Sequence, residues 1–351
     1  MSIPSLPHEL AAYGWDDEWA ASFAAAPSDG ARPARVARVD RGACNAVGEA
    51  AYRVQLHPRT EWPVTGDWIA VRPAGEGERL DQLVAVLPRR KALRRLDADE
   101  RRSQLVVANV DVVLAVLPLD RPVKPGLRDR LLVLSAEAGA EPVVVLSKAD
   151  VADPDVLGDL DADEAPGVTQ LVVSALRGEG VEDVRAAIGP RRTAVLLGPS
   201  GAGKSTLANA LLGEDLQRTG DVREGDHKGR HTTTSRELMI LPGGGVLIDT
   251  PGVRAVGLWD AEEGIEEVFS DIAELAGQCR FNDCAHETEP GCAIREAVAS
   301  GALDPGRVAR WRELSTEGEA RERLRVEHER RAQGRAFERQ LRAELKRKGR
   351  R

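Results

Sequence analysis

The stretch "GPSGAGKST", residues 198–206, constrains the fold of this chain more than any other feature. It follows the apolar run "TAVLL" and opens the run "STLANALL", so it has the strand before it and the helix after it that a phosphate-binding loop needs. In such a loop backbone N–H groups surround the β-phosphate, Lys204 reaches the β- and γ-phosphates, and the Ser205 hydroxyl ligates Mg²⁺. We predict a nucleoside triphosphate site here, the alternative being a chance glycine-rich turn. Its residues are Gly198, Pro199, Ser200, Gly201, Ala202, Gly203, Lys204, Ser205 and Thr206.

Continuous apolar runs alternate with amphipathic helices around this loop. Such runs are typical of strands in a sheet that is covered on both faces. Between two of them, "GLRDRLLVLSAEAGA" places Leu127, Leu131 and Leu134 at helical spacing and closes on Gly139. We therefore predict an α/β domain with strands at 110–117, 142–147, 169–174, 193–198 and 245–250.

The run "IDTPG", residues 248–252, supplies the other half of a nucleotide site. Asp249 at a strand end can hold Mg²⁺ through water, and Gly252 can offer its N–H to the γ-phosphate. One threonine of 232–234 could complete the metal shell, and we favour Thr233. We therefore expect Ser205 and Thr233 to be the magnesium ligands.

The predicted site lacks the usual residue for orienting the attacking water. Many GTPases carry a glutamine that orients water directly after the glycine of this motif, but Val253 stands there and cannot do so. Intrinsic hydrolysis should therefore be slow, and a partner must complete the site. His231 is the one candidate in the sequence for positioning water, although a histidine in a mobile loop is often simply solvated.

A guanine-reading turn is indicated by "VVVLSKAD", residues 143–150, an apolar strand that ends in Ser147, Lys148, Ala149 and Asp150. The Asp150 carboxylate can accept hydrogen bonds from guanine N1–H and the 2-amino group, and adenine lacks that donor pair. The run "VVSAL" fits the companion loop at the base edge, with Ser174 and Ala175. Because both base loops precede the phosphate loop, the parts of a GTPase domain occur in rotated order.

The residues before the α/β region have a different hydrophobic pattern. Residues 1–30 indicate a helical lead-in, and short β-like runs between about 34 and 96 favour a small barrel in which Cys44 is a packed thiol. The charged stretch 88–104 is interpreted as a linker. We predict four parts: a lead-in at 1–30, an OB-like barrel at 31–96, a permuted GTPase domain at 97–260, and a helical zinc-binding domain with a basic tail at 261–351.

Three of the four cysteines lie close together near residue 285. Cys279, Cys284, His286 and Cys292 give C-x₄-C-x-H-x₅-C, enough to close one tetrahedral structural Zn²⁺ site. A reduced cysteine cluster packed without metal is the alternative. A bound zinc would contribute folding free energy to a segment with few apolar residues.

Together these motifs resemble the bacterial ribosome small subunit-dependent GTPase A family, circularly permuted GTPases with an N-terminal OB-fold and a C-terminal zinc-binding domain. The resemblance covers nearly the whole chain and implies GTP hydrolysis stimulated by the 30S ribosomal subunit, with release late in 30S maturation. One departure is Ser147, where the family more often has Asn; since a hydroxyl reaches fewer hydrogen-bond partners, we expect this departure to affect guanine affinity more than guanine preference. The matching stretches are "GWDDEW", "TGDWIAV", "ANVDVVLAV", "GPSGAGKST", "GRHTTT", "DTPGVR" and "CRFNDCAHETEPGCAI".

Contact with 16S rRNA would need local basic surface, because the chain carries a formal net charge of −8. Residues 330–351 hold ten Lys or Arg against two Glu, and a second basic group lies in the predicted linker. Either could bind phosphates, or be a solvated charged segment. Few aromatic residues in the barrel are available to stack on bases, beyond Tyr52, Trp62 and Trp68. The second basic group consists of Arg89, Arg90, Lys91, Arg94, Arg95, Arg101 and Arg102.

Two other functions remain open at this point. One is a nucleotide-gated rRNA-binding assembly module in which hydrolysis is incidental, and the other is a redox sensor built on the cysteine cluster. The sequence contains no apolar run of the length that a membrane span needs and no leader pattern at its start, so we expect a cytoplasmic monomer that binds GTP and GDP and no membrane.

Overall fold

The structure of the chain is a computed structural model with two compact units. One unit comprises Met1–Leu93 with Leu105–Ala255, and the other comprises Arg94–Gln104 with Val256–Arg351. The residues that the structure describes are 8–27, 30–57, 61–75, 77–96, 103–122, 125–153, 167–213, 237–249, 262–320, 323, 326 and 330.

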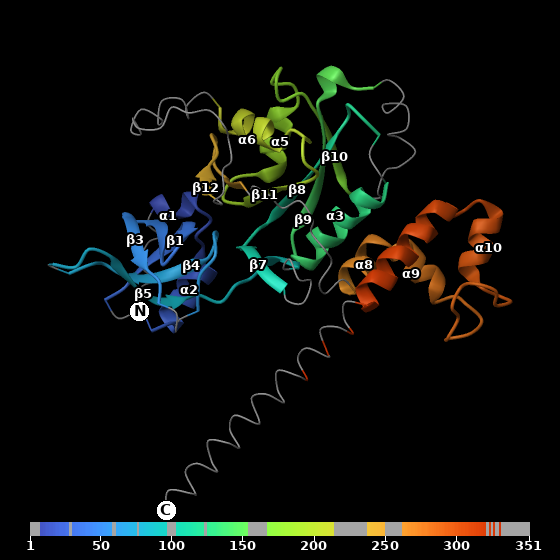
Figure 1. Ribbon diagram of the computed structural model, residues 1–351, viewed down its shortest axis with the longest axis horizontal. Coiled ribbons are helices and arrows are strands. Elements are labelled where there is room, and N and C mark those ends of the chain that lie inside the picture. Colours follow the sequence, from blue (N-terminus) through green and yellow to red (C-terminus); the bar gives the residue numbers. More distant parts are fainter. Residues whose placement is uncertain are drawn as a thin grey trace, which may run out of the picture. The chain divides into compact units, whose positions relative to one another are not determined.

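A closed barrel forms the N-terminal part of the first unit (Figure 1), as the sequence predicts. Its strands pair in the order β1-β2-β3-β5-β4, and alternate side chains fill its interior with small apolar groups. Cys44 is fully buried there, and burial raises the pKa of its thiol to about 12, which makes it unreactive. The strands are β1 Arg32–Asp40, β2 Ala43–Gly48, β3 Ala51–Gln55, β4 Trp68–Arg72 and β5 Asp81–Val86.

The helical lead-in packs on this barrel. It consists of α1 (His8–Ala12) and α2 (Asp17–Ala25), and the Asp16 side chain caps α2 by accepting a hydrogen bond from Trp19 N–H at 2.8 Å. Trp15 and Trp19 lie against Trp68 of β4, with ring centroids 4.7 and 6.1 Å apart. The lead-in therefore forms an apolar cluster with Trp68 and Leu87 that is separate from the barrel interior.

The α/β prediction is confirmed by a six-stranded sheet with the order β10-β9-β8-β11-β13-β12 (Figure 1). Every neighbouring pair is parallel except β12 with β13. The carboxyl ends of the parallel strands therefore meet at one edge, where ligands bind in sheets of this kind. The strands are β8 Val112–Pro118, β9 Glu141–Ser147, β10 Thr169–Val173, β11 Thr193–Leu197, β12 Glu237–Ile240 and β13 Val246–Asp249.

Helices cover this sheet. Helices α5 (Val181–Ile188) and α6 (Lys204–Leu212) share one apolar core with alternate residues of the strands, including Val112, Leu114 and Val116 of β8. Helix α3 (Pro125–Glu137) contacts β8 and β9. Every residue of β8 is buried, which explains why that strand is apolar without alternation.

The linker interpretation of residues 88–104 is wrong, because this stretch enters a two-stranded sheet of β6 (Ala92–Leu96) and β7 (Ser103–Ala108). Its first basic residues also have acidic partners. Arg89 binds the buried Asp67 at 2.7 and 2.8 Å, and Arg90 binds Asp16 at 2.6 and 2.7 Å. Lys91 pairs with Asp111 at 3.1 Å. These three basic side chains stabilise the fold through their ion pairs, so they are poor candidates for binding RNA phosphates.

A buried arginine joins the barrel to the six-stranded sheet. Arg35 of β1 donates to Gly66 O at 3.3 Å, Asn109 O at 3.2 Å and Thr193 Oγ1 at 2.7 Å, and also to Tyr13 O. Burial lowers its pKa to about 10, although the side chain remains charged at neutral pH. Its hydrogen bonds fix the barrel against the first residue of β11, which leads into the phosphate loop.

The second unit is mainly helical. It contains α8 (Glu262–Val268), α9 (Ser270–Ala276), α10 (Ala293–Ser300) and a helical stretch at 305–320. Arg307 donates to both carboxylate oxygens of Asp271 at 2.8 Å and lies over the Phe269 ring at 4.8 Å. Among the helices of the described residues, none is long and apolar enough to cross a membrane.

Candidate functional site

The phosphate loop has the position that the sequence predicts, between β11 and α6. Gly198 must be glycine because a Cβ there would lie 2.2 Å from Val116 O on the neighbouring strand. Gly203 caps α6 with a φ of +83°, in the left-handed region. Lys204 Nζ donates to Gly198 O and Pro199 O, each at 2.8 Å, so the lysine folds over its own loop. Ser205 and Thr206 are exposed in the first turn of α6.

Ser147 connects the guanine-reading turn directly to this loop. Its buried Oγ lies 2.6 Å from Ala202 O and 3.2 Å from Leu117 O. A hydroxyl has one proton to donate, so the shorter contact to the phosphate loop is the hydrogen bond. The turn and the loop are 55 residues apart in the chain and in direct contact in the fold. The hydroxyl therefore makes the link between the two segments that the predicted site requires.

Lys148 is held on both sides. It has a φ of +64°, a left-handed conformation that is unusual for a residue with a side chain. Its stem lies about 4 Å from the position that a Cβ on Gly203 would occupy, and its Nζ pairs with Asp120 Oδ2 at 2.6 Å. The Asp120 pKa is lowered mainly by that hydrogen bond from Lys148. Asp120, which follows the carboxyl end of β8 by two residues, is not among the residues predicted from the sequence; its place at a strand end is the signal that could have found it.

Asp150, which the sequence predicts to read the base, contacts the companion loop. It follows β9, and the Ser174 hydroxyl donates to its Oδ1 at 2.7 Å. Ser174 is buried after β10 and is itself held by backbone hydrogen bonds with Glu179 at 3.0 and 3.1 Å. Ser174 thus orients the Asp150 carboxylate and leaves further lone pairs for a base. Ala149 lies between Lys148 and Asp150, and Ala175 follows Ser174 in this companion loop.

The rest of the predicted nucleotide site is only partly visible. Asp249 ends β13, next to the phosphate-loop strand β11, as a residue that meets the metal should. His231, Thr233 and Gly252 lie outside the described residues, as do Thr232, Thr234 and Val253. The assignments of a water-positioning histidine and a magnesium-binding threonine therefore stay predictions.

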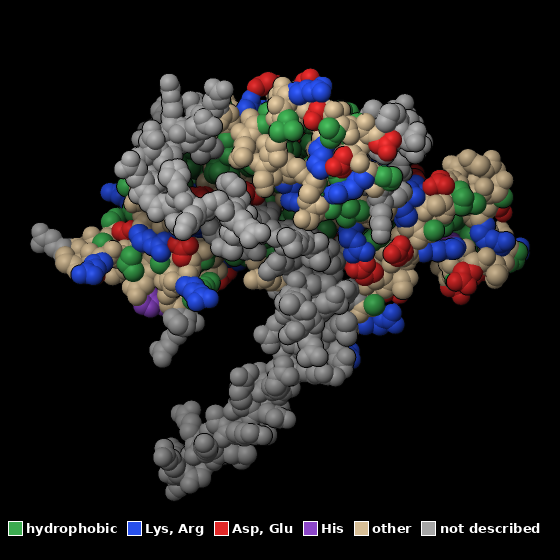
Figure 2. All heavy atoms as spheres, turned by 45° about the horizontal axis from the view of Figure 1, so that its top comes forward, with side chains coloured by type: hydrophobic (Ala, Val, Ile, Leu, Met, Phe, Trp, Pro, Cys, Tyr) green, Lys and Arg blue, Asp and Glu red, His purple; other side chains and the backbone are tan. Residues whose placement is uncertain are grey.

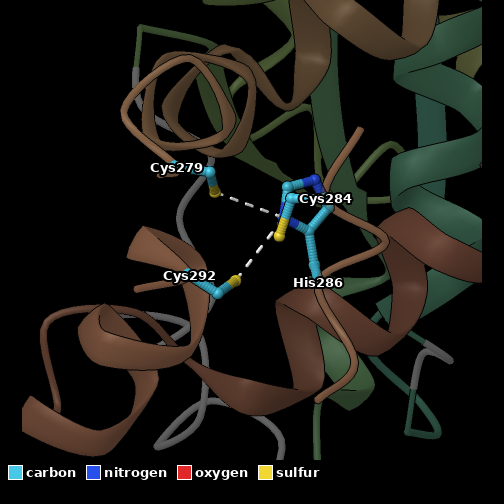
Figure 3. Close-up of side chains that lie close together, drawn as sticks. All are labelled: Cys279, Cys284, His286 and Cys292. Carbon is cyan, nitrogen blue, oxygen red and sulfur yellow. Dashed lines mark hydrogen bonds between the residues drawn. The ribbon is translucent and has the colours of Figure 1, made fainter. Parts of the chain in front are cut away.

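The cysteine and histidine cluster of the second unit is assembled as predicted (Figure 3). The ligand atoms of Cys279, Cys284, His286 and Cys292 all lie within 4.8 Å of one another. His286 Nδ1 is 3.5 Å from the Sγ atoms of both Cys279 and Cys292, and the side chains point toward one common centre. Three thiolates and one imidazole at this separation fit a single tetrahedral ion with metal–sulfur bonds of about 2.3 Å.

Local structure prepares this cluster for a metal. Burial, and then the positive charge of Arg312, lower the pKa of His286, which favours the neutral imidazole that can ligate. Glu289 accepts backbone N–H groups of Ala285, Glu287 and Thr288 at 2.9–3.1 Å, and backbone hydrogen bonds lower its pKa to about 2. That carboxylate fixes the loop between the second and fourth ligands.

The barrel offers little aromatic surface for stacking on bases. Trp68 and Tyr52 are buried, so of the three aromatic residues predicted to be available only Trp62 is exposed. On the face shown in Figure 2, the Lys and Arg side chains of the described residues are interspersed with Asp and Glu. Of the basic tail at 330–351, only residue 330 falls within the described part of the chain.

Comparison with known proteins agrees with this geometry. The RsgA GTPase family model matches residues 86–259, which hold both base loops, the phosphate loop and Asp249. A "Small ribosomal subunit biogenesis GTPase RsgA" from Streptomyces coelicolor is 48% identical over 343 residues, covering 92% of each chain. The protein of the same name from Xanthomonas campestris pv. campestris is 43% identical over 330 residues, covering 88% of each.

Solved structures show the same fold. The crystal structure of YjeQ from Thermotoga maritima has a TM-score of 0.63 and 25% identity, and covers 82% of this chain and 98% of that one. That of YloQ, described as a circularly permuted GTPase, has a TM-score of 0.61 and 23% identity, with 84% and 97% covered. The rotated order of motifs, the built guanine and phosphate loops and the extensive identity to these relatives lead to one assignment: the chain belongs to the RsgA family of circularly permuted GTPases.

Proposed function

We propose that this enzyme hydrolyses GTP to GDP and phosphate during maturation of the small ribosomal subunit, and that the 30S particle stimulates hydrolysis. The observation that carries the proposal is the hydrogen bond between Ser147 and Ala202, which joins the guanine-reading turn to the phosphate loop in one site. The ribosomal part rests on the relatives, which are named small ribosomal subunit biogenesis GTPases. An rRNA-binding module with incidental hydrolysis is not favoured, since the family is one of GTPases.

The metals of this function follow from two donor sets. Three cysteines and one histidine suit Zn²⁺, held as a structural ion with no open position for chemistry. Bound GTP would bring Mg²⁺ to the Ser205 hydroxyl, with Asp249 acting through water. We propose Thr233 as the second hydroxyl ligand of Mg²⁺ and His231 as the residue that positions water, on the sequence pattern alone.

The cellular setting belongs to the same proposal. A ribosome-dependent GTPase works in the cytoplasm, as a monomer that contacts 16S rRNA. Because Arg89, Arg90 and Lys91 are already paired with carboxylates, the basic tail at 330–351 is the better candidate for rRNA contact. The division into lead-in, barrel, GTPase domain and zinc-binding domain is the corresponding proposal for the architecture.

GTP turnover with and without purified 30S subunits tests the proposal, with 50S subunits and ATP as controls. We expect 30S subunits to stimulate GTP turnover by about a hundredfold or more, within the range that a completing partner supplies to GTPases. The variant Lys204→Ala should lose turnover in both conditions. Turnover of GTP that no ribosomal particle changes would refute the ribosomal part, and equal turnover of ATP would refute the guanine assignment.

A further inference from the structure

A cation other than Lys204 lies against the phosphate loop. Arg121 stands in the loop after β8, three residues beyond the end of that strand. Its Nη2 donates to Ser200 O at 3.1 Å. A Cβ on Gly201 would lie 3.5 Å from Nη2 and 4.0 Å from Nη1 of the same guanidinium group. The guanidinium group is therefore in contact with the backbone of the loop that binds phosphates, although the two segments are 79 residues apart.

The charge balance leaves this arginine available to an anion. Asp120 is shared by two cations, with Oδ2 2.6 Å from Lys148 Nζ and Oδ1 3.9 Å from Arg121 Nε. The first distance is a close ion pair and the second is at the limit of one, so the carboxylate mainly neutralises Lys148. Half of the Arg121 side chain is exposed, which gives the guanidinium group room to turn toward a ligand.

The chemistry of hydrolysis explains what this group can do. Water forms a new bond to the γ-phosphorus while the bond from that phosphorus to the β–γ bridging oxygen breaks. The bonding electron pair stays on the GDP oxygen, and the proton of water passes to the phosphate product and solvent. Negative charge therefore builds up on the phosphates, and a guanidinium group can bind two phosphate oxygens at once. The bond to Ser200 uses one of the five N–H groups of Arg121.

We propose that Arg121 is a catalytic residue supplied by the chain itself, which binds the β- and γ-phosphate oxygens of GTP and stabilises the charge of the transition state. This role is separate from water positioning, for which Val253 gives the chain no glutamine after Gly252. Arginines that act in this way in other GTPases raise turnover by about 10³–10⁵-fold. Arg121 lies at the loop before any partner binds, so it contributes to intrinsic hydrolysis as well.

Steady-state GTP hydrolysis at saturating GTP without ribosomal particles tests this role. The variants are Arg121→Ala and Arg121→Lys, and Arg41→Ala, which removes an exposed arginine from the turn after β1, is the matched control. We expect Arg121→Ala to lower kcat by about tenfold to a thousandfold and to change the Kd for GDP by less than about threefold. The kcat of Arg121→Lys should lie between those of the unchanged protein and Arg121→Ala, because an ammonium keeps the positive charge but cannot bind two phosphate oxygens in the planar geometry of a guanidinium group. Arg41→Ala should match the unchanged protein.

Chemical rescue separates catalysis from a structural role. Free guanidinium ion at a non-denaturing concentration should restore part of the kcat of Arg121→Ala and leave Arg41→Ala unaffected. An unchanged kcat in Arg121→Ala would overturn the proposal. So would equal weakening of GDP and GTP binding with normal kcat, because the arginine would then only hold the loop through Ser200. If Arg121→Ala does not bind GDP, the test passes to Arg121→Lys. A normal kcat in that variant would overturn the proposal as well.

Discussion

The six-stranded sheet and the cysteine and histidine cluster fix their functional side chains by different means. Strands β8 and β11 are buried along their whole length, and apolar packing together with the parallel strand pairing holds the sheet in order. The second unit buries fewer apolar side chains in its described part, and its ligand loop is held by backbone bonds to Glu289. We infer that one site is preorganised by packing and that the other depends on its metal.

This difference explains why the nucleotide site can form although its motifs occur in a permuted order along the chain. A site at the edge of a parallel sheet needs its loops at neighbouring strand ends, whatever the order in which the chain supplies them. Ser147 at the end of β9 and Ala202 after β11 meet across β8 in this way. A metal site has no such scaffold, so its ligands come from one short stretch of the chain.

Removing the metal should have the largest effect and should separate the two regions. Chelation, or Cys292→Ser, should unfold the ligand loop of the second unit, since a structural zinc contributes about 10 kcal/mol or more. GDP binding in the first unit should remain. Hydrogen exchange with and without chelator, followed by GDP titration, measures both. If chelation lowered protection from hydrogen exchange equally in β8 and α10, the two regions would not differ in their dependence on the metal. Cys44→Ser is the control, because it leaves the metal ligands intact.

Breaking the junction at Arg35 should have the next largest effect, and in the other region. Arg35→Ala removes the buried arginine donor from Asn109 O and Thr193 Oγ1, and leaves Gly66 O with only its hydrogen bond from the Asn109 side chain. We expect the free energy of unfolding of the first unit to fall by about 2–4 kcal/mol. Denaturant unfolding followed by tryptophan fluorescence checks this, with the exposed Arg41→Ala as control. A loss below about 0.5 kcal/mol would contradict the structural role of the junction.

Ser147→Ala should give a moderate effect that is confined to the nucleotide site. It removes the hydroxyl that joins the guanine turn to Ala202 O, a bond worth about 1 kcal/mol net, or up to about 3 when a buried acceptor is left unpaired. GDP affinity should therefore fall about fivefold to a hundredfold, and metal content should stay the same. Isothermal titration with GDP measures the affinity. Ser147→Asn should bind at least as well as the unchanged chain, because a carboxamide can reach the same carbonyl.

The smallest expected effect is the pH dependence of one ion pair in the second unit. Hydrogen bonds from Arg307 lower the pKa of Asp271 in the folded state, so the pair stabilises the fold above the ordinary carboxyl pKa and loses that contribution as pH falls through the lowered value. The Asp271 side chain is 42% exposed, and solvent screening keeps the contribution below about 1 kcal/mol. The stability difference between the unchanged chain and Asp271→Asn in thermal unfolding should begin to shrink as pH falls below about 4, and it should vanish below the lowered pKa. A difference that does not shrink between pH 7 and pH 3 would contradict this assignment.

The sequence predicts the parts of this molecule whose chemistry is local. The phosphate loop, the guanine turn and the metal ligands each need particular residue types at a fixed spacing, and each lies where the pattern places it. The bounds of β2 are less readable from its own residues, because "ACNAVG" has small side chains and little β-propensity and pairs with both β1 and β3.

Long-range pairing accounts for the other errors. Arg89 and Arg90 look like linker charges until Asp67 and Asp16 are brought beside them by the fold. The grip of Asp120 on Lys148 and the contact of Arg121 with Ser200 likewise join segments 28 and 79 residues apart. Charge patterns in a sequence give no register for such contacts, so the linker interpretation failed and Asp120 went unnoticed.

The affinity of the Asp150→Asn variant for guanosine and xanthosine diphosphates tests most directly whether the rotated segments form one guanine site. The unchanged chain should bind guanosine diphosphate far better, because its carboxylate pairs with the two donors of guanine. Asparagine brings a donor that suits the extra oxygen of xanthine, so the variant should reverse the preference by about tenfold or more. An unchanged preference for guanosine diphosphate would contradict the account, because Asp150 would then not face the base.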